Sequence, residues 1–155
     1  MRRLALLIAF SPVILFAGSS TPIAYPAGYR TWAHVRSGLV GPASSSFAAT
    51  GGLHHVYAND KALKGYRSGK FPDGSVIVFE LLKVEEKDGV TTEGSRVRLD
   101  MMRKDSRRYS DTAGWGYERF RGDSTTDRLS STVGKLKCAE CHSAQKNSIF
   151  GELRK

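Results

Sequence analysis

The segment KCAECHSAQK, residues 137–146, holds the residues best suited to chemistry in this chain. It contains both cysteines, Cys138 and Cys141, separated by two residues, and His142 directly follows the second. Thiol and imidazole groups at this spacing suit three kinds of chemistry: binding of a metal ion, redox exchange of a dithiol, or covalent attachment of a cofactor.

Covalent haem attachment is the chemistry that accounts for all three residues. Each thiol adds to a vinyl group of the porphyrin, and the histidine becomes an axial ligand of the iron. A structural zinc ion needs four ligands, and the other three histidines lie far away in the sequence. A redox dithiol is typical of a helix start in a thioredoxin-like unit, whereas this segment lies near the C-terminus. The spacing therefore favours one haem c, bound through Cys138 and Cys141 with His142 as iron ligand, over zinc or a dithiol.

The first 20 residues have the features of a secretory signal peptide. Arg2 and Arg3 precede an apolar run, Leu4–Phe16, and small residues follow at 17–19. The run is shorter than the ~20 residues that a membrane-spanning helix needs. We therefore expect a cleaved signal at 1–20, a periplasmic protein, and no stable membrane insertion. Haem c is assembled in that compartment.

The chain is basic, with a formal net charge of +9. A basic balance is one feature of nucleic-acid binding, but the lysines and arginines are scattered and exported proteins rarely meet nucleic acid. We expect a solvated basic surface that could face an acidic partner, and no nucleic-acid partner.

Alternating apolar residues predict several strands ahead of the cysteines. Residues 32–40 predict a short helix leading to a strand, and residues 41–52 predict a loop. A short helix is expected at 61–68, with its N-cap at Asn59-Asp60 and its end at Gly69. Strands are expected at 53–58, 75–86, 96–104 and 115–122. Residues 75–86 are apolar on both faces, which predicts a strand covered on both sides, on one of them by porphyrin. On the strand at 96–104, Val97, Leu99 and Met101 are expected opposite Arg96 and Arg98.

These elements predict a single α+β domain over residues 21–155. Its fold class is a mostly antiparallel β-sheet with one or two short helices and one covalently bound haem near the C-terminal end.

Three features together resemble the cytochrome P-460 family, including its cytochrome c′-β relatives. They are YRTWAHV at 29–35, YANDKALKGYRSGKFPDGSVIVFELL at 57–82, and the C-terminal CxxCH. The resemblance implies an antiparallel fold with one haem, whose iron is held by the CxxCH histidine and open on the opposite side. It also implies dimers, although no interface is evident in the sequence.

The hydroxylamine-oxidising members carry a lysine that links to the porphyrin edge, and Phe79 stands at that position here. Lys83, two residue pairs further along the strand, is too far away to replace it. As in the c′-β relatives, the resemblance implies an aromatic cap: Phe79 packs over the open side of the haem or in the core beside it. An apolar cap favours neutral diatomic ligands over oxygen activation.

Other residues stay open as candidates near the iron. Met101 is a core residue or a sixth ligand, and only one of the neighbouring His54 and His55 can point toward the haem. The propionates have candidate partners in Arg96, Arg98, Arg119 and Arg121, and a proton acceptor could be Glu80, His55 or Asp100.

Three functions follow from these alternatives. The leading one is a single-haem cytochrome with five-coordinate iron that binds small ligands such as nitric oxide. The others are an enzyme oxidising hydroxylamine or a similar nitrogen compound, and a six-coordinate electron carrier. Each needs a redox partner protein, and whether the chain is an enzyme stays open.

Overall fold

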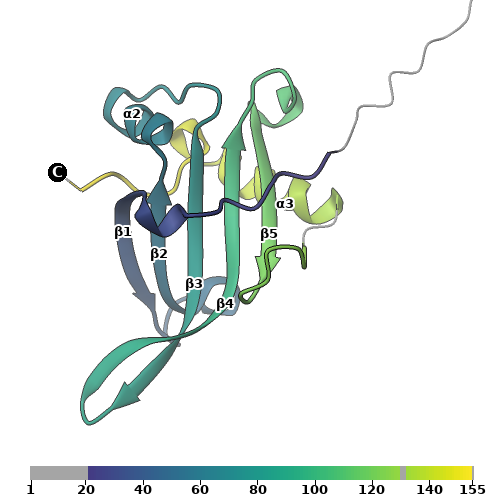
Figure 1. Cartoon of the computed structure of the whole chain (residues 1–155). Coiled ribbons are helices and arrows are strands. Elements are labelled where there is room, and N and C mark those ends of the chain that lie inside the picture. The colour runs from purple at the N-terminus through teal and green to yellow at the C-terminus, as the bar shows by residue number, and fades with distance from the viewer. Residues whose placement is uncertain (1–20, 130–131, 155) are drawn as a thin grey trace, which may run out of the picture.

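The computed structural model describes residues 21–129 and 132–154, so the expected signal peptide at 1–20 lies outside the described residues. Its main element is an antiparallel five-stranded sheet in the order β1-β2-β3-β4-β5 (Figure 1). The strands are β1 (Ala33–Val40), β2 (Gly52–Ala58), β3 (Val76–Lys87), β4 (Val90–Lys104) and β5 (Trp115–Arg121). The helices are α1 (Phe47–Thr50), α2 (Asp60–Ser68) and α3 (Thr132–Ser143), with short 3₁₀ turns η1 (Tyr29–Thr31), η2 (Ser110–Thr112) and η3 (Lys146–Ser148).

The α+β expectation is confirmed, with three corrections. The described residues contain three α-helices instead of one or two. The helical turn before the first strand is η1, so residues 33–40 are extended throughout. The expected loop at 41–52 contains the single turn α1. None of the described helices is long and apolar enough to cross a membrane.

The helix α2 begins and ends at the residues that the sequence indicates. The Asn59 side chain accepts a hydrogen bond from the Ala62 amide at 2.9 Å, which satisfies a free donor of the first turn. Gly69 ends the helix with φ of 75°, a left-handed conformation that glycine adopts without steric cost. A turn at Asp88 and Gly89, both with positive φ, then joins β3 to β4.

The sheet is covered on both faces. We call the face covered by α3 and the C-terminal segment the helix side, and the face covered by residues 21–32 the N-terminal side. In Figure 1 the N-terminal segment (purple) crosses in front of the sheet, and α3 (yellow-green) lies beside β5. The helix-side core is Val35, Val56, Ala58, Ala62, Ile77, Met102, Trp115 and Tyr117, and the N-terminal-side core is Ile23, Tyr29, Val78, Leu99, Met101 and Phe120. The strand β3 contributes to both, as its two-sided apolar pattern predicted.

A β-bulge in β4 alters the expected arrangement of side chains. Leu81 pairs with Arg98, but the next β3 residue, Leu82, pairs with Arg96, so Val97 has no partner on β3. The extra residue turns Arg96 to the N-terminal side, while Val97 is exposed. The expectation that Arg96 shares a face with Arg98 is therefore wrong at this end of the strand.

Candidate functional site

The helix α3 presents the two thiols and the imidazole on one side. Cys138, Cys141 and His142 stand at positions i, i+3 and i+4, which are neighbours on a helix surface. Cys138 packs against the helix-side core, and Cys141 is exposed. Neither cysteine is in a disulfide. Cys138 and His142, whose ring contacts Tyr117, therefore lie toward the sheet, whereas Cys141 is exposed.

The His142 ring is held in one tautomer. Its Nδ1 lies 2.8 Å from the Ser148 carbonyl oxygen, and because a carbonyl only accepts, Nδ1 carries the proton. Asn147 and Ser148 bring that carbonyl back to the ring through positive φ angles of 57° and 61°. Burial lowers the pKa of His142, while the Ser148 hydrogen bond and the Asp100 charge act in the opposite direction. A neutral ring protonated at Nδ1 has its lone pair on Nε2, the arrangement that a metal-binding histidine needs.

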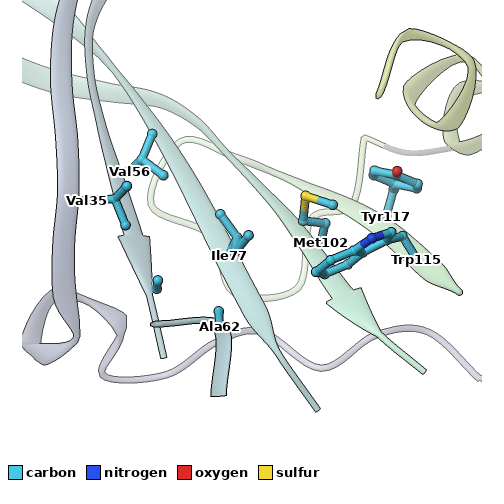
Figure 2. Packing of buried hydrophobic residues seen from close by; sticks show 8 residues of the cluster. Val35, Val56, Ala62, Ile77, Met102, Trp115 and Tyr117 are labelled. Carbon is cyan, nitrogen blue, oxygen red and sulfur yellow. The ribbon is translucent and has the colours of Figure 1, made fainter. Parts of the chain in front are cut away.

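The sheet opposite α3 supplies an aromatic and apolar wall. Tyr117 lies beside His142, with ring centroids 5.1 Å apart, and Phe150 lies edge-on to the same imidazole with centroids 4.8 Å apart. Figure 2 shows Met102, Trp115 and Tyr117 grouped on β4 and β5. Phe79 is only partly buried and packs against the same core as Cys138. Phe79, predicted from the sequence, therefore packs against the same helix-side core as Cys138 of the CxxCH motif.

A charged group interrupts this wall. The Asp100 carboxylate lies directly across from Phe79 on β4 and accepts hydrogen bonds from Arg119 Nη2 at 2.8 Å and Arg98 Nε at 3.0 Å. Burial raises the pKa of Cys138 and the charge of this carboxylate adds to that shift, whereas at His142 the same charge opposes the lowering of the pKa by burial. Asp100 and its two arginines therefore lie within electrostatic reach of the cysteines and histidine.

The four candidate arginines are separated by the structure. Arg98 and Arg119 lie on the helix side with Asp100. Arg121 is the strand partner of Arg98, and its side chain bonds Asp127 near the surface. Arg96 lies on the N-terminal side, where it donates to the Gly122 carbonyl and the Tyr29 hydroxyl. Arg98 and Arg119 are thus the arginines positioned nearest to the motif.

Three further candidates lie away from α3. Met101 belongs to the N-terminal-side core. Glu80 is fully buried on that side and bonds Tyr29, Arg30 and Arg96. His55 bonds Ser37 and Glu93. Of the proposed proton acceptors, Asp100 alone is on the helix side.

Two further residues line the wall: Met102, which the sequence reasoning did not single out, and His54, one of the two neighbouring histidines that it left open. Met102, only 5% exposed, lies between Ile77 and Tyr117 in the strand register. His54 is 9% exposed and stacks on Phe79, which resolves the choice between the two neighbouring histidines in terms of face. Strict alternation along β4 from Asp100 would have placed Met102 on this face as well.

The comparison with known families agrees with this site. A model of the cytochrome P460 family matches residues 26–150. The chain belongs to the cytochrome P460 family. No curated protein matches it. Membership implies that the chain binds haem.

The residues present fit a haem. The family's prosthetic group needs an imidazole with a free Nε2 and an apolar wall, and His142 and the Phe79 face supply them. A redox dithiol fits this site less well. Burial raises the pKa of Cys138, whereas a reactive dithiol needs a lowered one.

Proposed function

We propose that this member of the cytochrome P460 family is an exported c-type cytochrome with one haem that binds a small ligand such as nitric oxide. In this proposal Cys138 and Cys141 form thioether bonds to the porphyrin, and His142 Nε2 binds the iron. The observation that carries the proposal is the hydrogen bond from His142 Nδ1 to Ser148, which leaves Nε2 as the free lone pair on the same side of α3 as both thiols.

The described residues support an iron that is open opposite His142. Met101, the sixth ligand considered from the sequence, lies on the other face of the sheet. Phe79 stands where the resemblance places the linking lysine of the hydroxylamine-oxidising members, and a phenyl ring forms no such link. Lys83 is exposed at the outer part of β3. Phe79 and its neighbours instead exclude water from the wall that faces α3.

A bound haem supplies a ferrous or ferric iron that takes up small ligands and exchanges electrons. The chain's own residues set the conditions for that chemistry. Burial keeps His142 neutral. Asp100 places a negative charge near the same imidazole, and Arg98 and Arg119 balance it. These two arginines are also the best placed to meet the propionates.

The test is an absorption spectrum of the protein made with a working haem-maturation system. We expect a haem that stays attached on denaturation, a five-coordinate ferrous spectrum, and a shift on adding carbon monoxide. Cys138→Ser with Cys141→Ser should release the haem on denaturation, while Ser143→Ala, on the same helix, should retain it. A six-coordinate ferrous spectrum without added ligand, from Met102 for example, would contradict the open iron.

The alternative is an enzyme that oxidises hydroxylamine or a similar nitrogen compound. The observation in its favour is that Asp100, a proton acceptor, lies on the helix side. However, the Asp100 carboxylate already accepts hydrogen bonds from Arg98 and Arg119. Steady consumption of hydroxylamine by the haem-loaded protein with an electron acceptor, and its loss in Asp100→Asn, would favour the enzyme over the ligand-binding cytochrome.

We place the mature protein in the periplasm, where an acidic redox partner would meet its basic surface. This part of the proposal rests on the signal-like residues 1–20 and on the formal net charge, which is +9 for the full chain and +7 without Arg2 and Arg3. Fractionation of cells expressing the full chain tests it, since haem-containing protein in the cytoplasm alone would contradict it.

A further inference from the structure

His54 is a buried histidine on the helix side of the sheet. It lies on β2, opposite Gly38 on β1 and Leu81 on β3, and its ring stacks on Phe79 with centroids 4.9 Å apart and planes inclined by 23°. Only 9% of the residue is exposed. A polar ring is therefore built into an otherwise apolar part of the sheet.

Its Nδ1 atom is buried and has no hydrogen-bond partner within residues 21–129 and 132–154. Buried polar atoms in folded proteins almost always have a partner, and an exception needs an explanation. Burial, followed by the charges of Arg36 and His55, lowers the pKa of His54, so the ring is neutral and has one N–H to donate. A ligand that accepts this hydrogen bond would satisfy the atom.

The strand opposite holds the ring in place. A Cβ atom at Gly38 would lie 2.6 Å from His54 Cε1 and 2.8 Å from Nε2, so only glycine leaves room for the imidazole there. Phe79 closes the other side of the ring. Because both neighbours are parts of the sheet, the position of His54 is fixed by the backbone of β1 and by β3.

The same wall extends to the haem-binding motif. Phe79, on which His54 stacks, packs against the core that Cys138 contacts, and its partner on β4 is Asp100, which acts electrostatically on Cys138 and His142. His55, the next residue, points to the N-terminal side and bonds Ser37 and Glu93. His54 is thus the histidine that can reach a ligand held between the sheet and α3.

We infer that His54 donates a hydrogen bond from Nδ1 to the small ligand on the open side of the iron, beside Phe79. The inference rests on the proposed function. The inference narrows the class of ligand to small molecules, such as nitric oxide, or anions whose outer atom accepts a hydrogen bond. Ligands recognised by shape alone would not need His54. His54 is then a specificity-determining residue, and Phe79 excludes water from the bond.

The test uses haem-loaded protein and two probes, carbon monoxide on the ferrous iron and fluoride on the ferric iron. In His54→Leu we expect the C–O stretching frequency to rise, because a hydrogen bond to the ligand oxygen lowers it, and the fluoride affinity to fall about tenfold. His54→Gln, which keeps a donor, should recover part of both. Gly38→Ala, which displaces the ring but keeps the histidine, should resemble His54→Leu. His55→Leu is the matched control and should resemble the wild type.

The outcomes separate this inference from the proposed function. Carbon monoxide binding with an unchanged stretching frequency and fluoride affinity in His54→Leu would overturn the inference alone. No carbon monoxide binding in any variant would overturn the proposed function. A six-coordinate ferrous wild type that becomes five-coordinate only in His54→Leu would make His54 an iron ligand and overturn both.

Discussion

Individual side chains on the two faces of β3 have separate tasks. Phe79 lies on the helix side, beside His54 and Asp100, whereas its neighbour Glu80 is fully buried on the other side. There one carboxylate oxygen, Oε1, accepts from Tyr29, Arg30 and Arg96. Consecutive strand residues point to opposite faces. Glu80 therefore contributes to stability on the face of the sheet away from the CxxCH motif.

Glu80→Ala should destabilise the fold without changing the haem site. The substitution removes the carboxylate that accepts a hydrogen bond from the buried Tyr29 hydroxyl and pairs with Arg96, whose side chain is 8% exposed. Loss of one partner of a buried pair costs about 3 kcal/mol of unfolding free energy. Denaturant unfolding measures this loss, and Glu86→Ala at the exposed end of the strand should change stability by less than about 0.5 kcal/mol. A changed carbon monoxide spectrum in Glu80→Ala would contradict the separation of the two faces.

At the scale of elements, the packing between α2 and the turn before β3 explains a glycine that local preference disfavours. Gly65 lies inside α2, where glycine costs about 1 kcal/mol relative to alanine. A Cβ there would lie 2.2 Å from Phe71 Cδ1, and Phe71 packs edge-on to Trp115 at 5.6 Å. Tertiary contact therefore overrides helix propensity at this position.

Gly65→Ala should reduce the free energy of unfolding by about 1–2 kcal/mol, because the added methyl group displaces Phe71 from the helix-side core. In a Phe71→Ala background the same substitution should stabilise the protein by about 1 kcal/mol, since the helix preference is then unopposed. Denaturant unfolding of the four variants forms a double-mutant cycle. Equal effects of Gly65→Ala in both backgrounds would show that the Phe71 contact does not matter.

Local sequence signals predict some of these elements, whereas others depend on pairing between distant segments. Local signals predicted α2, because Asn59 and Gly69 act on their own helix, and β3, because its apolar residues mark both faces. The CxxCH spacing likewise predicted the neighbouring thiols and imidazole on α3. The side of Arg96 depends on a bulge that forms only when β4 pairs with β3, and the Ser148 carbonyl reaches His142 only through the turn after α3. Non-local pairing of this kind leaves no local pattern.

Across the whole molecule, tyrosines are buried on both faces of the sheet. Tyr29 on the N-terminal side bonds Glu80, and burial with that bond raises its pKa to about 12. Burial alone raises the pKa of Tyr66, on the helix side, to about 12. Burial also raises the pKa of Tyr117, beside His142. Both sides of the fold therefore favour the neutral phenol.

Stability should consequently fall in alkaline solution. A tyrosine whose folded-state pKa exceeds its unfolded value of 10.0 stabilises the fold fully below pH 10, and this contribution is lost as the pH rises toward about 12. Denaturant unfolding at pH 8, 10 and 11, with phenolate absorbance followed in parallel, measures the loss. In Tyr66→Phe the decline above pH 10 should be shallower, because that phenol no longer ionises on unfolding. An equally steep decline in this variant would show that Tyr66 ionises as readily in the folded protein as in the unfolded chain.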